Sequence, residues 1–439
     1  MIPILSALIE KQTRILRFVL LPSIISLITF LDIKAQSQVH GLKQLQSMAM
    51  PLLAETSDQA ANAKIYESLF KGKELIALGE STHGTKEFNV YRDQMIRAMV
   101  SNGSVKTIVF EADYCSLSKL NDLLVYGKSD SLLKGMPGLY GIYRTREVYE
   151  MLLWVYKYNQ SVQVQERVQI KGGDMQDPYS ITKSILDNLK NPKLLRTTSL
   201  ERLQKLHLLY KPAKEMKHSK ADMTAYREMI KDLYTVFAQH ENSESRQYVR
   251  LLEQTLALRE APFSQYGTLR DQFMAENVMH IYNQKPEESK VILWAHNGHI
   301  AHARLSKIYR MGYHLKDELG EKYYALALAF NEGASRIFDV EGSSRGYKKF
   351  DYPASLKTNS LEFVLQGVGH PAFVIDLQEA KKEENAKALL DKAKYMRVIG
   401  ATYLEPDSKN YFWVPVFESF DGILFFQKTT AAESITSRM

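Results

Sequence analysis

Residues 75–92, LIALGESTHGTKEFNVYR, constrain the fold more than any other segment of this chain. The apolar run LIAL predicts a buried strand that stops at a glycine, and a helical pattern begins near Thr85. Between them stand two residues that can transfer protons, Glu80 and His83. Open α/β sheets bind ligands beyond the carboxyl ends of their strands, so we expect acid/base chemistry at this turn.

Strand and helix patterns alternate along the rest of the chain. Because helical stretches separate the strands, we predict an α/β fold with a mostly parallel sheet flanked by helices. A helix is expected over residues 145–159, capped by Thr145. The expected strands are residues 75–78, 105–111, 168–174, 290–296, 323–330, 371–376 and 422–427.

Residues 178–266 have almost no strand pattern and are rich in Leu, Lys, Glu, Met and Tyr at helical spacing. We interpret them as a helical insertion, which either forms a cap over the sheet or packs as ordinary helices against it. The insertion divides the predicted catalytic α/β domain into residues 40–177 and 267–430. Residues 430–439 are expected to be a frayed tail.

The N-terminal segment resembles a secretory signal peptide. A basic flank precedes the apolar residues 18–31, which are too few to span a bilayer comfortably, and a small residue, Ala35, follows. We expect residues 1–35 to direct export to the periplasm or the medium, with no stable membrane insertion after cleavage after Ala35. A buried N-terminal helix is the alternative, and translation starting further along would also account for the long basic flank.

Charge and cysteine content narrow the function classes. The net charge of +7 is spread over 439 residues among acidic groups, which disfavours nucleic acid as a partner. The single cysteine, Cys115, cannot form an internal disulfide. It is interpreted as a small core side chain, with a nucleophile as the less favoured alternative.

Ionisable residues end three further strand patterns. Glu111 follows the second strand, Asp174 the third, and His296 the fourth, with His299 three residues later. In a parallel sheet all of these reach the same edge, where the two histidines could bind a metal or transfer protons.

Two arginines are expected near this edge. Arg92 shares a helical face with apolar residues that turn inward, so it needs a carboxylate or an anionic ligand. It either pairs with Glu80 or Glu111 or stabilises a developing oxyanion, and both roles are compatible. Arg270 is expected to open a helix over residues 270–277, at the mouth of the site, with a surface charge pair as the alternative.

Three ordered motifs resemble those of the erythromycin esterase family. They are GESTHGTKEF at residues 79–88 with Arg92, RDQFMAEN at 270–277, and AHNGH at 295–299, within a likeness covering about residues 60–428. The resemblance implies that His83 activates a water molecule for attack on a macrolide lactone, with Glu80 beside it and without a required metal. The segment YRTRE at 143–147 departs from the family, whose members often carry tryptophans there.

The resemblance also carries the later catalytic roles to Arg92 and to His296, with His299 as the alternative histidine. We therefore expect an esterase acting on a small-molecule ester, either a macrolide lactone or another bulky or cyclic ester, with no cofactor and no metal. The predicted catalytic residues are His83, Glu80, Arg92 and His296; the predicted substrate-binding residues are His299, Glu111, Arg270 and Asp174.

Two other hypotheses remain open from the sequence. The first is a metal-dependent hydrolase that uses Glu80, His83, His296 and His299 as ligands. The second is an envelope binding protein that keeps the fold without the chemistry. The motifs for a serine-hydrolase elbow, a phosphate-binding loop, a dinucleotide fold and a zinc-protease helix are absent from the sequence.

Overall fold

The computed structural model describes residues 36–435 except 37, 54–58, 129–130, 211–218, 239–242, 306–307 and 340–345. The predicted signal peptide, residues 1–35, lies outside the described residues. Among the described helices, none combines the length and apolar character needed to cross a membrane.

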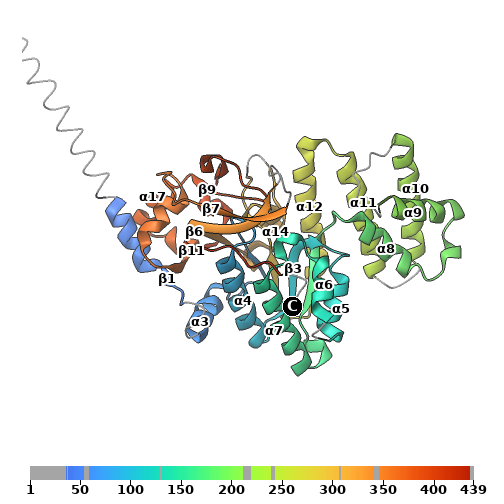
Figure 1. Ribbon diagram of the computed structural model, residues 1–439, viewed down its shortest axis with the longest axis horizontal. Coiled ribbons are helices and arrows are strands. Elements are labelled where there is room, and N and C mark those ends of the chain that lie inside the picture. The colour runs from blue at the N-terminus through green and yellow to red at the C-terminus, as the bar shows by residue number, and fades with distance from the viewer. Residues whose placement is uncertain are drawn as a thin grey trace, which may run out of the picture.

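Within the described residues, nine strands form one sheet with the order β1-β8-β11-β6-β2-β5-β3-β4, and β7 pairs with β6 (Figure 1). The strands from β11 to β4 in this order are parallel, whereas β1, β7 and β8 pair antiparallel with their neighbours. The predicted mostly parallel α/β fold is therefore confirmed. The strands are β1 (Met50–Pro51), β2 (Leu75–Leu78), β3 (Val105–Asp113), β4 (Gln169–Asp174), β5 (Lys290–Trp294), β6 (Tyr323–Asp339), β7 (Gly346–Tyr352), β8 (Ala372–Asp376) and β11 (Gly422–Lys428), and β9 (Tyr395–Arg397) pairs with β10 (Tyr411–Trp413) in a separate ribbon.

Helices cover both faces of the sheet, so the central strands carry apolar side chains on both faces. On β2, Leu75 and Ala77 face one core cluster, and Ile76 and Leu78 face the other. The second cluster includes α3 (Gln59–Leu69), α4 (Lys86–Ser101), α5 (Ser118–Tyr126) and α7 (Arg146–Ser161). The first includes α12 (Phe263–Tyr282), α14 (Met311–Leu319), α15 (Leu361–Leu365), α16 (Leu377–Ala380) and α17 (Glu384–Leu390). Shorter helices are α6 (Leu132–Gly135), α13 (Asn297–Ile300) and α18 (Val416–Ser419).

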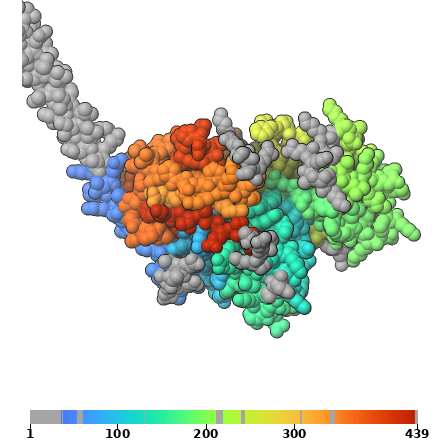
Figure 2. Space-filling view, in the orientation of Figure 1, coloured from blue at the N-terminus to red at the C-terminus, as the bar shows by residue number. Residues whose placement is uncertain are grey.

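Four helices that follow β4 form a lobe at one end of the molecule (Figures 1 and 2). The lobe comprises α8 (Pro178–Asn188), α9 (Thr197–Tyr210), α10 (Lys220–Ala238) and α11 (Ser243–Glu260). It is anchored to the strand end by the hydroxyl of Thr255, which donates to the carbonyl of Met175 at 2.7 Å. The division of the chain into a catalytic domain and an inserted cap stays a prediction.

Three expectations were wrong in detail. Arg270 lies in the middle of α12, because the helix begins directly after Pro262, which needs no N–H partner at a helix start. Strand β6 continues to Asp339, since its second half pairs with β7. Residues 430–435 are not frayed: their backbone N–H groups bond to Glu87, Gly84, Glu147 and Arg144.

The turn between β2 and α4 is packed against backbone on several sides. A side chain at Gly79 would overlap Asn297, and a Cβ at Gly84 would lie 2.0 Å from the carbonyl oxygen of Arg336. The carbonyl of Gly84 accepts N–H groups from Arg336 and Ala432, each at 2.9 Å. The turn is thus fixed by β6 and by the C-terminal segment, residues 430–435.

Replacing Gly84 by Ala tests this constraint against a matched glycine. Gly84 (φ +66°) and Gly72 (φ +72°) share a left-handed conformation, but among the residues that the structure describes no atom lies within 4 Å of a Cβ added at Gly72. We expect Gly72→Ala to cost about 1 kcal/mol of unfolding free energy from strain alone, and Gly84→Ala about 3 kcal/mol because overlap adds to strain. Urea unfolding measures both, and equal losses would show that the packing around Gly84 is loose.

Candidate active site

His83 and Glu80 form a buried pair at the carboxyl end of β2. Nδ1 of His83 lies 2.8 Å from Oε1 of Glu80, and both side chains are over nine-tenths buried. An ionised carboxylate only accepts hydrogen bonds, so Nδ1 carries the proton and Nε2 keeps its lone pair. Within the described residues no hydrogen-bond partner of Nε2 is present. His83 is therefore arranged as a base whose reactive nitrogen is open to a ligand or water.

Arg92 keeps Glu80 ionised. Its Nη1 lies 3.1 Å from Oε2 of Glu80, and its Nε and Nη2 donate to the carbonyl of Gly79. Burial opposes the charge of Glu80, but Arg92 and then His83 outweigh it and lower the Glu80 pKa to about 2. The Arg92 side chain is completely buried, and its guanidinium lies 4.5 Å from the centre of the Trp294 ring. These contacts favour the ion-pair interpretation of Arg92 over direct contact with an oxyanion.

His296 is the histidine nearest to His83, with ring centres 5.3 Å apart. Its Nδ1 accepts the N–H of Gly298 at 3.1 Å, and its Nε2 lies 3.2 Å from the carbonyl oxygen of Ile399, to which it donates. Burial lowers the pKa of His296, and the nearby His83 ring lowers it further, to about 4. At neutral pH this ring is therefore uncharged, with its proton on Nε2.

His299 has the opposite character. Burial disfavours its charge, but Asp271, 2.6 Å from Nδ1, and Glu111, 3.2 Å from Nε2, raise its pKa to about 9. Nη1 of Arg270 also lies 3.2 Å from Nε2, a contact that would suit only a neutral ring. Two carboxylates flank the imidazole and Arg270 has acceptors of its own, so we assign His299 as a cation.

Arg270, Glu111 and Asp174 meet at the ends of β3 and β4. Nη2 of Arg270 lies 2.6 Å from Asp174 and 3.1 Å from Glu111, while the other oxygen of Glu111 accepts the N–H of His296 at 3.0 Å. The Asp174 side chain is completely buried, which favours a role in holding Arg270 over direct contact with a substrate. Arg270 and His299 are each 15% exposed, so a ligand can reach both of these charged groups.

All eight predicted site residues thus lie in one continuous set of contacts. Sequence reasoning missed Tyr140 and Tyr143, whose hydroxyls donate to Asp174 and Glu80, and it gave no role to Arg310, which donates to Asp271. Asp271 entered the sequence analysis only as part of the motif RDQFMAEN at residues 270–277. Tyr140 caps a short 3₁₀ turn and Tyr143 ends it, and such a turn has no periodic pattern of apolar residues. In the sequence, only the difference from the family at residues 143–147 pointed to this region.

Other candidates lie outside this set of contacts. His302, three residues after His299, instead has its Nε2 3.0 Å from Oδ2 of Asp421 and its ring beside that of Tyr323. Cys115 is buried, and burial raises the pKa of its thiol well above the ordinary value, as suits a core side chain. Over the described ranges, no group of three or more His, Cys, Asp or Glu residues is placed to hold a metal ion.

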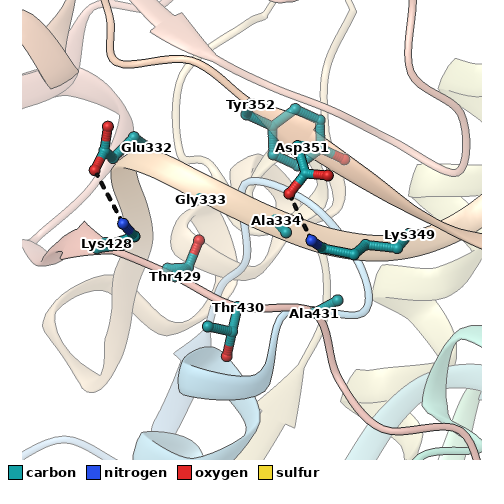
Figure 3. A pocket seen from close by; sticks show the side chains of 10 residues that line it. All are labelled: Glu332, Gly333, Ala334, Lys349, Asp351, Tyr352, Lys428, Thr429, Thr430 and Ala431. Atoms are coloured by element: carbon teal, nitrogen blue, oxygen red, sulfur yellow. Dashed lines mark ion pairs between the residues drawn. The ribbon is translucent and has the colours of Figure 1, made fainter.

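A cavity of about 480 Å³ lies beside the turn but contains none of the predicted site residues (Figure 3). Its walls carry two ion pairs, Lys428–Glu332 at 3.6 Å and Lys349–Asp351 at 2.8 Å. Tyr352, on the same wall, bonds to Ser335, which in turn contacts Thr82 in the turn. The wall of the cavity is therefore linked to the turn through Tyr352 and Ser335.

The sequence of this chain is similar to that of a known protein family and of a curated relative. The family model described as erythromycin esterase matches residues 100–429, most of the chain. The chain belongs to the erythromycin esterase family. YbfO of Bacillus subtilis strain 168, provisionally named a hydrolase, is 21% identical over 414 residues, which cover 83% of this chain and 88% of YbfO.

Three solved structures have a similar fold. A Bacillus cereus protein is 21% identical with a TM-score of 0.79, covering 91% of this chain and 99% of its own. A protein titled as a succinoglycan biosynthesis protein is 20% identical with a TM-score of 0.78 and the same coverage. A mutant of the erythromycin esterase EreC in its open conformation is 18% identical with a TM-score of 0.65, covering 89% of this chain and 99% of its own. At these identities the likeness establishes the fold.

The charge on His299 predicts a loss of stability in alkali. A pKa raised from 6.5 to about 9 stabilises the folded protein below pH 6.5, and this contribution disappears as the pH rises towards 9. We expect the free energy of unfolding of the wild type to fall by about 3 kcal/mol at most over this range because of His299. The variant His299→Asn should lack this part of the decline.

Urea unfolding at pH 6 and pH 9 measures the difference. The control is His370→Asn, a half-buried histidine whose ring lies beside Phe373. The control should keep the wild-type decline. A decline in His299→Asn as steep as in the wild type would contradict the assignment of a cationic His299.

Proposed function

We propose that this protein is a carboxylic ester hydrolase in which His83 activates water. The observation that carries the proposal is the pairing of Nδ1 of His83 with an ionised, Arg92-bound Glu80, which directs the lone pair of Nε2 outward. A positioned imidazole with an orienting carboxylate is the arrangement that general-base catalysis uses. Membership of the erythromycin esterase family supports the same reaction class.

The proposed reaction needs no covalent intermediate with the protein. Nε2 of His83 takes a proton from water as the oxygen attacks the ester carbonyl carbon, and the carbonyl electrons move to the oxygen. When the tetrahedral intermediate collapses, the bond to the alkoxy oxygen breaks and the leaving alkoxide receives the proton from His83. The products are a carboxylic acid and an alcohol.

The developing oxyanion needs positive charge on the side of the substrate away from His83. His299 and Arg270 are charged and partly exposed, and Nη1 of Arg270 has no carboxylate acceptor among the described residues. The neutral ring of His296 is close to both histidines, since its centre lies 5.3 Å from that of His83 and 6.4 Å from that of His299. We assign oxyanion stabilisation to Arg270 and His299, and orientation of Glu80 to Arg92.

For the substrate we propose a macrolide lactone or a related bulky or cyclic ester. The support is the family and the similar fold of the erythromycin esterase EreC. We also propose that the mature protein acts outside the cytoplasm, in the periplasm or the medium, on the basis of the signal-like pattern in residues 1–35.

Removing the base tests the reaction. We expect His83→Ala to lower kcat/KM for ester hydrolysis by at least about 10³-fold, and Glu80→Gln by about 10²-fold, because the first removes the proton acceptor and the second its orienting charge. The matched control is His302→Asn, a histidine that faces Asp421 instead, which should stay within about threefold of the wild type. Circular dichroism checks folding, and turnover by His83→Ala at the wild-type rate would end the assignment.

The substrate and the metal question are tested together. Incubation of the mature protein with macrolides of two ring sizes should add one water to the lactone, which mass spectrometry detects. Dialysis against a chelator should leave the rate unchanged, because Nδ1 of His83 and both ring nitrogens of His296 already have protein partners. Stoichiometric metal whose removal stops hydrolysis would favour the metal-dependent hypothesis. Tight binding of a ligand without turnover would favour a binding protein.

A further inference from the structure

One short turn contacts both halves of the active site: the half that contains His83 and Glu80, and the half that contains Arg270 and Asp174. The 3₁₀ turn η4 (Gly141–Tyr143) precedes α7, and it brings two tyrosine hydroxyls to two different carboxylates. Tyr140 donates to Oδ2 of Asp174 at 2.9 Å, and Tyr143 donates to Oε1 of Glu80 at 3.3 Å. Asp174 holds Arg270, and Glu80 orients His83.

The two carboxylates lie at strand ends that are far apart in the sheet. Glu80 follows β2 and Asp174 ends β4, and β5 and β3 lie between them. Three strand spacings amount to about 14 Å, whereas four residues in a 3₁₀ turn advance only about 6–8 Å. The long tyrosine side chains make up the difference, which a shorter hydroxyl side chain could not do.

The hydroxyl of Tyr143 completes the surroundings of Glu80. Oε1 accepts from both Nδ1 of His83 and Tyr143, and Oε2 accepts from Arg92. Burial and the charges of Glu80 and Glu111 raise the pKa of Tyr143 well above the ordinary value, so its hydroxyl stays a donor at working pH.

The ring of Tyr143 is held by packing. It meets His83 edge to face at 6.2 Å, Phe110 at 5.7 Å and Trp294 at 6.0 Å between ring centres. The turn itself is tied down by Arg144, which donates to the carbonyls of Leu139 and Pro137. The carbonyl of Arg144 accepts the N–H of Ile435, so the C-terminal segment also fixes the turn.

We propose that Tyr143 is a positioning residue for the His83 base, and that Tyr140 and Tyr143 together fix the distance between the base and the Arg270 half of the site. By donating to Oε1, Tyr143 shares the charge of Glu80 with His83 and limits how strongly Glu80 attracts the imidazole proton. The catalytic part of this inference rests on the proposed function.

The test compares Tyr143→Phe, Tyr140→Phe and Tyr149→Phe in the full chain. Tyr149, a half-buried residue of α7, serves as the control for losing a tyrosine hydroxyl in the same region. For Tyr143→Phe we expect kcat to fall about tenfold with KM within about twofold, because the base is misplaced while substrate contacts remain. The acidic limb of the kcat/KM profile should move up by about half a pH unit, since Glu80 then holds a protonated His83 more strongly.

For Tyr140→Phe we expect kcat to fall about threefold or more with the acidic limb in place, because Arg270, which stabilises the oxyanion, loses support while Glu80 keeps its partners. Tyr149→Phe should match the wild type. If Tyr143→Phe leaves the acidic limb and kcat unchanged, or if Tyr149→Phe moves them equally, the positioning role is overturned. If Tyr140→Phe leaves kcat unchanged, the coupling of the two halves is overturned.

A second measurement needs no substrate and separates this inference from the proposed function. In ¹⁵N-histidine-labelled protein, the Nδ1–H proton of His83 should move downfield in Tyr143→Phe and upfield when Tyr143 is replaced by 3-fluorotyrosine, a stronger donor of nearly the same shape. Shifts in these directions support the positioning role even if no ester is hydrolysed. An unchanged resonance in both proteins overturns it even if hydrolysis is confirmed.

Discussion

The buried ion pair between Arg92 and Glu80 is the interaction on which the site depends. Glu80 has almost no exposed surface, so without a permanent cation beside it the carboxyl would be neutral and could not orient His83. Arg92 reaches Glu80 from the buried face of α4, and its guanidinium also binds the carbonyl of Gly79. The packing of α4 on the sheet therefore fixes the charge state of Glu80 and the tautomer of His83.

The two histidines that follow β5 differ in charge, and the difference suits two different roles. Burial beside His83 keeps His296 neutral, whereas Asp271 and Glu111 keep His299 charged only three residues later. Glu111 contacts both, through the backbone N–H of His296 and the ring of His299. A neutral ring next to the base avoids competition for its proton, and a cation further away suits a developing negative charge.

The sequence allowed the sheet and the strand-end chemistry to be predicted, because both depend on local patterns. Buried parallel strands are short apolar runs, and Glu80, Glu111, Asp174 and His296 stand within a few residues of the ends of such strands. The contacts of Tyr143 were not predictable, since they depend on how a nonperiodic turn meets distant strands. The ordered C-terminal segment was missed for the same reason: its bonds to Gly84 and Arg144 join residues far apart in the chain.

Buried ion pairs are a costly way to stabilise a fold, since desolvation of both charges offsets their attraction. The site nevertheless contains several, among them Arg92–Glu80, Arg270–Asp174 and Arg310–Asp271, and in these three the acid is completely or almost completely buried. Apolar side chains of similar volume would stabilise the core about as well. What apolar residues cannot supply is a fixed direction for the hydrogen bonds of His83, Arg270 and His299. The three pairs therefore serve the geometry of the reaction more than the stability of the fold.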